Sequence, residues 1–312
     1  GLCNDSLALY ASHPIGPDLV RAALDVPADL YIAHYTAALP AAALAARHRG
    51  ASYAFDAEDF HSGELPNERR YDQQRVVIRH IESRYLRGCA YVTAASPGIA
   101  GAYVDAYGIN RPTVVLNVFP LETDVSQSAT GGKSRHAPSL YWFSQTIGSS
   151  RGLECAVRAI ALARSRPRLH LRGTPAPGFL AKLQTIAAEY GVVDRLHILP
   201  PAAPSEMVRL AAVHDLGFSG ENALTVNRSV ALGNKLFTYL LAGLPIVMSA
   251  IPGHTDIAPS FGEAARLYPI DDSPALAARL DEYLLEPDVL ASARGMPTLV
   301  GLQADVEGPA DG

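Results

Sequence analysis

One segment of the chain combines small residues, an arginine and a helix start, the groups that can hold an anion. A strand-like apolar run within residues 142–160 leads into this segment, and a helix-like stretch follows it. Its residues of interest are Gly148, Ser149, Arg151 and Gly152. Small residues let backbone N–H groups approach an anion, a helix N-terminus adds partial positive charge, and arginine can bind phosphate through two N–H groups. The segment is a candidate phosphate site, and an ordinary loop with a solvated arginine is the alternative.

A second segment, residues 227–254, repeats this chemistry at another predicted helix start. Asn234 is suited to cap a helix that begins at Lys235, and Gly243 can end that helix before the next strand. A lysine in the first turn is unfavourable to the helix dipole unless an anion lies nearby. Lys235 is therefore a second candidate cation, and a tolerated surface lysine is the alternative.

Two polar residues of the first half follow predicted strands and could act on a proton. His34 ends the strand DLYIAH, where a neutral imidazole could take a proton from a hydroxyl group. Asp59 lies in FDAEDFH, after the next strand, and is a second candidate base. The alternatives are a structural histidine and a carboxylate that caps a helix or lies in a solvated turn.

Short apolar runs alternate with helix-like stretches along the whole chain, which predicts an α/β fold with parallel sheets and helices on both faces. The expected strands are 30–34, 53–56, 91–94, 114–117, 140–144, 169–172, 196–199, 215–219 and 246–249. The expected helices are 37–48, 68–86, 152–164, 178–190, 205–212 and 234–243. Ligands of such sheets bind beyond the carboxyl ends of the strands, which is where all the candidate residues fall.

The chain divides into two expected domains of the Rossmann-like type. Residues 121–138 are polar, rich in Ser, Thr and Gly, and without periodicity, which is typical of a linker. We expect an acceptor-side domain over 1–120, a donor domain over 139–312, and a ligand cleft between them. The first domain opens without the usual strand and glycine-rich loop, so we expect it to be incomplete at its start.

Composition excludes several classes of protein. A net charge of -5 argues against a nucleic-acid partner. The longest apolar stretch, 236–251, contains Gly243 and Pro245 and falls short of the roughly 20 residues of a spanning helix. Three widely spaced cysteines suggest free thiols in a reducing compartment. We expect a cytoplasmic protein without a transmembrane segment. Peripheral contact with a membrane is compatible with this expectation.

The stretch NKLFTYLLAGLPIVMS resembles the "NK-hydrophobic-hydrophobic-E-Y-x-x-A-G-x-P-V-V" segment of family 4 glycosyltransferases, which have the two-domain GT-B fold. The resemblance implies transfer of a sugar from a nucleotide-diphosphate sugar to a hydroxyl of a carbohydrate or lipid-linked acceptor, in carbohydrate biosynthesis. It also implies retention of anomeric configuration and no cofactor beyond the donor substrate. No DxD pair suggests a metal, and fixed cations can stabilise a leaving diphosphate instead.

The resemblance extends to residues of the expected donor site. The family's Lys-Gly pair at the start of the donor domain matches Arg151 and Gly152. A further family arginine falls near Thr146, so one cation is missing. Glu221 and Asn222, in FSGENAL, lie in the loop that approaches the donor sugar in the family, and a simple turn is the alternative.

Other matches depart from the family pattern. The glutamate that usually bonds the donor ribose falls at Thr238, whose hydroxyl can still do so, and its upstream partner falls at Val230. His34 matches the second histidine of the family's "D-x-x-H-x-H" strand, and Asp59 lies where the family often has Asp-x-His-Glu.

Two other function classes stay open. The missing glutamates favour a non-catalytic or degenerate nucleotide- or sugar-binding relative of the same fold. A sugar-nucleotide epimerase or hydrolase would also use two Rossmann-like domains. A dinucleotide oxidoreductase is disfavoured, because no G-x-G-x-x-G follows a strand with an acidic residue at the required distance.

Overall fold

The computed structural model describes residues 5–118 and 137–294, and these divide into two compact units. Unit 1 runs to Asn117 and also includes Ala223–Ala231, and unit 2 contains Val118–Asn222 and the chain from Leu232 onward. Residues 223–231 were predicted to belong to the donor domain, whereas they pack in unit 1. Residues 121–136 of the expected linker lie outside the described residues.

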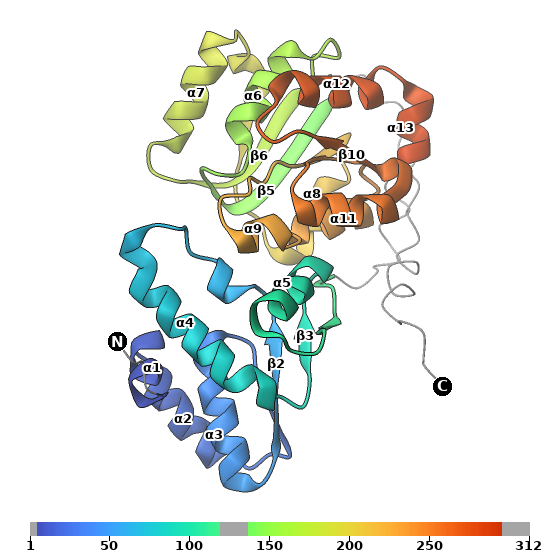
Figure 1. The fold of residues 1–312 in the computed structure, drawn as a ribbon. Coiled ribbons are helices and arrows are strands. Elements are labelled where there is room, and N and C mark those ends of the chain that lie inside the picture. The colour runs from blue at the N-terminus through green and yellow to red at the C-terminus, as the bar shows by residue number, and fades with distance from the viewer. Residues whose placement is uncertain (1–4, 119–136, 295–312) are drawn as a thin grey trace. The chain divides into compact units, whose positions relative to one another are not determined.

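Unit 1 contains a parallel four-stranded sheet of order β1-β2-β3-β4 (Figure 1). The strands are β1 (Leu30–Ala33), β2 (Ser52–Ala57), β3 (Val92–Ala94) and β4 (Thr113–Val114). Each overlaps one of the predicted apolar runs, and β4 does so only at Val114. Because the strands are parallel, their carboxyl ends share one edge, and Ala33 of β1 pairs with Phe55 of β2.

The helices of unit 1 are α1 (Asp5–Ser12), α2 (Gly16–Asp25), α3 (Leu39–Arg49), α4 (Asp72–Tyr85), α5 (Pro97–Tyr107) and the short α9 (Val226–Val230). Their ends follow ordinary capping chemistry. The Ser96 side chain accepts a hydrogen bond from Ile99 N, and Pro97 takes the first helical position of α5. Gly50 ends α3 at φ 69°, a conformation that glycine adopts without strain.

A carboxyl group is buried in the core of unit 1. The Glu82 side chain accepts hydrogen bonds from the hydroxyls of Tyr103 (3.0 Å), Thr36 (3.3 Å) and Tyr107. Burial is the largest influence on Glu82 and raises its pKa above the ordinary value, although the hydrogen bonds from Tyr107 and Tyr103 act in the opposite direction.

The segment Ala223–Ala231 is held in unit 1 by side-chain hydrogen bonds. The Asn227 amide donates to Asp59 Oδ1 at 2.7 Å and accepts from Phe60 N at 2.8 Å. Ser96 Oγ donates to Val230 O at 2.8 Å. Since these groups are buried or half-buried, the bonds fix the segment's position in unit 1.

Unit 2 contains a parallel six-stranded sheet of order β10-β9-β8-β5-β6-β7. The strands are β5 (Ser139–Ile147), β6 (Arg168–Pro175), β7 (Leu196–Leu199), β8 (Leu216–Ser219), β9 (Ile246–Ser249) and β10 (Ala265–Tyr268). The first five match predicted strands. Strand β10 was not predicted, because its four residues include Arg266 and form no clear apolar run.

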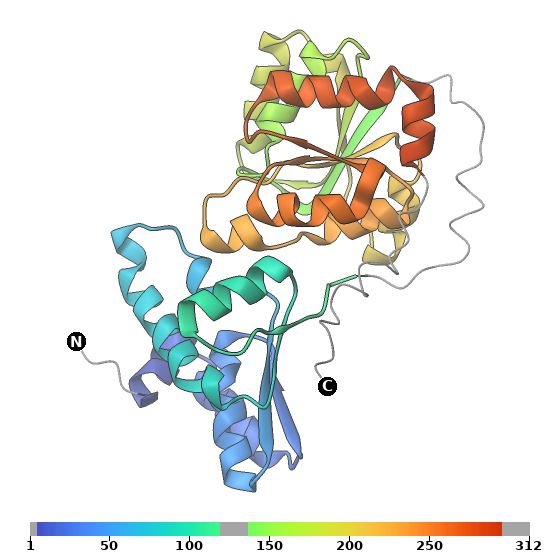
Figure 2. The same ribbon diagram turned by 45° about the vertical axis from the view of Figure 1, so that its right-hand side comes forward.

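Helices cover both faces of this sheet, as Figures 1 and 2 show. They are α6 (Leu153–Leu162), α7 (Phe179–Glu189), α8 (Met207–Ala211), α10 (Asn234–Leu241), α11 (Pro252–Phe261), α12 (Ser273–Leu284) and α13 (Pro287–Ala293). Helix α10 begins at Asn234 with Gly233 as its N-cap, one residue earlier than predicted. Four of these helices, α6, α7, α8 and α10, match predicted ones.

Two further properties bear on the chain's surroundings. None of the helices in the described ranges has the length and apolar character needed to cross a membrane. Cys89 and Cys155 are free thiols, and the third cysteine, Cys3, lies outside the described residues.

Candidate functional site

The candidate donor residues of unit 2 gather at the carboxyl edge of its sheet. They come from the loop after β5, the loop after β8 and the first turn of α10. Parallel strands bring these loops to one edge, so residues far apart in sequence share a site.

A glycine allows the first two loops to meet. Gly152 has φ 65°, and a Cβ atom there would lie 2.4 Å from Gly220 O. No other residue fits so close to that carbonyl. Gly152 therefore brings Arg151 beside the loop that carries Glu221.

Arg151, Glu221 and Lys235 form one ion cluster. Arg151 Nη1 contacts both carboxylate oxygens of Glu221, at 2.9 and 3.0 Å, and Lys235 Nζ lies 3.3 Å from Glu221 Oε1. Lys235 Nζ also lies 5.7 Å from the ring centroid of Trp142. The anion that the sequence predicts beside Lys235 is, in this structure, a carboxylate of the chain itself.

Glu221 is held in its ionised form. Burial alone would raise its pKa, but the positive charges of Lys235 and Arg151 and their hydrogen bonds outweigh burial, so the pKa lies below its ordinary value. Only 8% of Glu221 is exposed, so these interactions act in a largely water-free environment. The cluster carries two positive charges and one negative charge.

A buried histidine supports the loop that carries Glu221. Ser249 Oγ donates to the backbone oxygen of Glu221, and His254 Nδ1 lies 2.8 Å from Ser249 O. Because Nδ1 donates to that carbonyl, Nε2 is left to accept from Ser219 Oγ at 3.5 Å. Burial lowers the pKa of His254 to about 4, so the ring is neutral at pH 7. None of these three residues was predicted to belong to the site, although Ser219 and Ser249 end predicted strands.

A cavity of about 380 Å³ lies beside Lys235 at the carboxyl ends of β5 and β6. It is lined by Phe143, Ser144, Gln145, Arg172, Pro201, Ala202, Pro204, Met207, Asn234, Lys235 and Thr238. Strand β5 shifts register between Phe143 and Thr146. A Cβ atom on Gly173 of β6 would lie 2.2 Å from Ser144 O, so glycine permits this irregular wall.

One of the two positions where the sequence departs from the resembled pattern, Thr238, lines this cavity, and the other, Thr146, does not. Thr238 lines it and donates its hydroxyl hydrogen bond to Asn234 O at 3.2 Å, which leaves the hydroxyl oxygen as an acceptor. Thr146 is exposed and brings no cation. Arg172 was not predicted, although its side chain lines the cavity and donates to Tyr141 Oη at 2.9 Å. An arginine inside the apolar strand LHLRG is the feature of the sequence that could have indicated it.

The remaining donor-side candidates contribute space and one unsatisfied group. Gly148 is half-buried and Ser149 is exposed, both directly after β5. Asn222 follows Glu221, and its side-chain oxygen is buried without a hydrogen-bond partner among the described residues. A buried amide oxygen of this kind is suited to accept a hydrogen bond from a ligand.

In unit 1, His34 was predicted to end the first strand; β1 ends one residue earlier, at Ala33, and His34 follows it directly among acidic side chains. His34 Nδ1 lies 3.0 Å from Asp56 Oδ2 and 3.9 Å from Glu58 Oε1. Ligand atoms of the three residues lie within 4.8 Å of one another, close enough to coordinate a metal ion, a spacing that exposed carboxylates often show without one. The His34 side chain is 63% exposed, so it is accessible to a substrate hydroxyl.

Asp59 has different partners from His34. Its carboxylate accepts the Asn227 hydrogen bond, and burial raises its pKa against the lowering effect of that bond. A raised pKa suits a general base, but the bond to Asn227 also fixes the carboxylate as part of the unit 1 fold. The structure thus places His34 beside Asp56 and Glu58, and Asp59 beside Asn227.

Similarity to known proteins was found at the level of the fold. No family model matches the sequence, and no curated protein matches it significantly. HepE from Anabaena, crystallised with UDP, matches at TM-score 0.72 and 18% identity over 93% of this chain and 78% of HepE.

Two further solved structures match similarly. Sucrose-phosphate synthase from Thermosynechococcus elongatus gives TM-score 0.72 and 14% identity over 97% of this chain and 76% of its own. The lipopolysaccharide outer core galactosyltransferase WaaB matches at TM-score 0.64 and 13% identity, over 94% of this chain and 75% of WaaB. The fold is therefore the GT-B fold, as predicted.

Proposed function

We propose that this chain is a glycosyltransferase that moves a sugar from a nucleotide-diphosphate sugar to an acceptor hydroxyl. The observation that carries the proposal is the cluster of Arg151 and Lys235 around Glu221, beside a cavity at the carboxyl edge of the unit 2 sheet. The GT-B fold supports it, since HepE, which shares the fold, was crystallised with UDP and with UDP-glucose.

The cavity suits the nucleoside part of the donor. Phe143, Pro201 and Met207 give it apolar wall area for a base, and Asn234 and Thr238 offer polar groups for a ribose. Lys235 lines the same cavity, so a diphosphate attached to that nucleoside would reach the cations. The sugar would extend toward Asn222.

Donor binding in this proposal exchanges one anion for another. Glu221 now holds Arg151 and Lys235 in place, and a diphosphate would take over part of these contacts. The cations are thereby preorganised before the donor arrives, which reduces the reorganisation that binding requires.

The reaction builds negative charge on the leaving diphosphate. Arg151, Lys235 and the N-terminus of α6 are fixed positive groups that can stabilise this charge without a metal ion or another cofactor. His34 is our candidate to take the acceptor proton, with Asp59 as the second candidate. The resemblance to family 4 supports a retaining reaction on a carbohydrate or lipid-linked acceptor, and the free thiols support a cytoplasmic location.

Calorimetric titration with UDP, GDP, ADP and their common sugar conjugates tests the proposal. One nucleotide should bind saturably, and Arg151→Ala should weaken it about 10- to 100-fold, because one charged hydrogen-bonding group is lost. Arg168→Ala is the matched control, since this exposed arginine begins β6 at the opposite edge of the same sheet. Absence of binding by every nucleotide, or equal affinity in Arg151→Ala, would contradict the donor site.

A second candidate is a nucleotide-binding protein that does not turn over. The observation that favours it is Glu221, which already satisfies both cations. Nucleotide binding without transfer to any acceptor would support this reading. Release of free sugar from the donor alone would instead indicate a hydrolase.

A further inference from the structure

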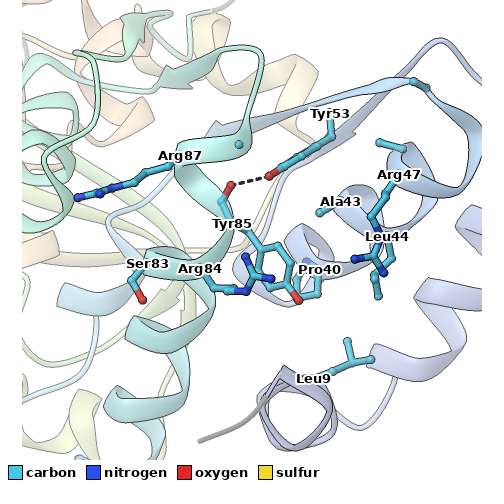
Figure 3. Close-up of a pocket in the computed structure, with 13 residues that line it drawn as sticks. Leu9, Pro40, Ala43, Leu44, Arg47, Tyr53, Ser83, Arg84, Tyr85 and Arg87 are labelled. Carbon is cyan, nitrogen blue, oxygen red and sulfur yellow. Dashed lines mark hydrogen bonds between the residues drawn. The ribbon is translucent and has the colours of Figure 1, made fainter.

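Unit 1 contains a larger cavity, of about 880 Å³, away from its candidate catalytic residues (Figure 3). Helices α1, α3 and α4 and the start of β2 surround it. Its lining residues are Leu9, Pro40, Ala43, Leu44, Ala46, Arg47, Ala51, Tyr53, Ser83, Arg84, Tyr85, Arg87 and Gly88.

This cavity lies at the amino edge of the unit 1 sheet. Tyr53 is the second residue of β2, whereas Asp56 and the residues after it lie at the carboxyl end of the same strand. Strand β2 spans roughly 17 Å. A molecule bound at the amino edge is therefore not the acceptor whose hydroxyl reacts near His34.

The cavity combines an apolar floor with guanidinium groups on its walls. In Figure 3, Pro40 and the ring of Tyr85 lie between the side chains of Arg47, from α3, and Arg84, from α4. Arg87 is directed away in the same view and donates to Tyr107 O at 3.2 Å. None of the described lining residues is acidic, so the walls carry positive charge next to apolar surface.

Part of the wall is rigidly built. Tyr53 Oη donates to Tyr85 O at 2.7 Å. A Cβ atom on Gly88 would lie 2.1 Å from that hydroxyl, so glycine is required for the ring to occupy its place. The space between α3 and α4 is thus preformed, which favours binding because little ordering is left to occur.

We propose that this cavity binds a phosphate monoester with an apolar body. Guanidinium groups bind phosphate oxygens through paired N–H bonds, which suits Arg47 and Arg84, and Pro40, Leu44 and the Tyr85 ring offer apolar contact to the rest of the molecule. The proposal does not depend on the donor site, because every lining residue belongs to unit 1.

Titration with octyl phosphate tests this proposal, with inorganic phosphate and octyl glucoside as probes of the head group and the apolar body alone. Octyl phosphate should bind saturably and more tightly than either. Arg47→Gln should weaken it at least about ten-fold, since a charged hydrogen-bonding group is lost. Arg21→Gln removes the same charge from an exposed position on α2 outside the cavity and should leave affinity unchanged.

A blocking variant guards against a misfolded Arg47 variant. Ser83 is exposed on α4 at the cavity, and Ser83→Trp should obstruct the space beside Arg84 and weaken octyl phosphate binding without changing charge. Equal binding of octyl glucoside, no saturable binding, or binding that neither variant weakens would overturn the proposal. UDP affinity is measured in parallel and should not change in either variant.

A vesicle sedimentation assay distinguishes a lipid head group from a phosphate monoester free in solution. Sedimentation with phosphatidylcholine vesicles that contain phosphatidic acid, lost in Arg47→Gln, would identify a lipid head group as the ligand. Binding of octyl phosphate without sedimentation would identify a monoester free in solution. Both results support the cavity as a phosphate monoester site.

Discussion

Among the described residues, each unit buries one glutamate, and the two side chains have opposite surroundings. Glu82 of unit 1 accepts hydrogen bonds from hydroxyl groups, and its pKa is raised by burial. Glu221 of unit 2 is also buried, but Lys235 and Arg151 lower its pKa in spite of that burial. Burial alone therefore does not determine the charge of a carboxyl group.

The difference separates a structural residue from a candidate functional one. Glu82 joins α4 to Tyr103 and Tyr107 of α5 within a hydrophobic core. Glu221 lies in the loop after β8, in contact with two cations, one of which lines a cavity. Ionised groups held in this way commonly mark binding or catalytic sites.

The largest expected effect on folding is that of Glu221→Gln. The substitution leaves two cations in a mostly buried site without their carboxylate, so the free energy of unfolding of unit 2 should fall by about 3 kcal/mol. The affinity for a nucleoside diphosphate should rise, because the competing anion is gone. Urea unfolding followed by fluorescence of Trp142, the chain's single tryptophan, measures the first effect, and calorimetry measures the second.

Glu82→Gln is the matched substitution in unit 1. Its side-chain oxygen can still accept from Thr36 and Tyr103, so a loss of only about 1 kcal/mol is expected, without any change in nucleotide affinity. Equal losses in both variants would show that the cations around Glu221 do not distinguish the two sites.

A fall in pH should lower the contribution of His254 and Glu221 to the stability of unit 2 and raise that of Glu82 to the stability of unit 1. The pKa of folded His254 is about 4, against an ordinary 6.5, so an unfolded chain binds a proton in this interval that the folded chain does not. Its contribution, about 3 kcal/mol, is therefore lost as pH falls from about 6.5 to 4. Glu221 adds to this loss at lower pH. Because its pKa is lower in the folded chain than in the unfolded chain, it stabilises the fold above the unfolded pKa, and this contribution disappears as pH falls through the folded pKa.

Glu82 should respond in the other direction. Its raised pKa contributes stability at low pH, and this is lost as pH rises through the folded value. For unit 2, the free energy of unfolding, measured by Trp142 fluorescence, should fall between pH 7 and pH 4. His254→Asn should make this free energy less dependent on pH. A wild-type profile that is already flat would refute the assignment of a neutral, buried His254.

Asn227→Ala should cost unit 1 about 2 kcal/mol, because Phe60 N and the Asp59 carboxylate each lose a hydrogen bond. Circular dichroism during thermal unfolding measures the loss. Asn227→Asp is the sharper control: it keeps an acceptor for Phe60 N but places a second carboxylate beside Asp59, so destabilisation should grow as pH rises. A pH-independent effect would argue against that contact.

The smallest effect on folding is expected for His34→Asn. Its side chain is largely exposed, so the free energy of unfolding should change by less than about 0.5 kcal/mol. Transfer to the acceptor should nevertheless fall about 100-fold, as for the loss of a general base, while donor affinity stays the same. Normal turnover in this variant would assign His34 a structural role.

The sequence predicted most strands of both units, because short apolar runs between helix-like stretches have few other solutions in an α/β fold. Residues 140–144 and 246–249 are examples, since both lie in strands of the structure. Strand β10 was missed because its burial depends on pairing with β9, and four residues that include an arginine have no period of their own.

The candidate site was predicted in part. Arg151 and Lys235 stood out because helix starts and cations are local features of a sequence. The ion pairs to Glu221 and the support from His254 depend on three loops that meet only after the sheet has formed, so no local pattern contains them. Asp59 was a candidate base from its place after a strand, and its bond to Asn227 joins positions too distant in sequence to be read together.

Segment 223–231 has a consequence for any attempt to recombine this chain with a relative. The chain leaves unit 2 after Asn222, contributes this segment to unit 1, and re-enters unit 2 at Leu232, shortly before Lys235. A chimera made by joining one protein's first half to another's second half at a single crossover would also replace the partner of Asp59 and Phe60. Such a hybrid would carry the relative's residue at position 227 in the core of its first unit, so exchange of the second unit requires that the native segment be grafted back.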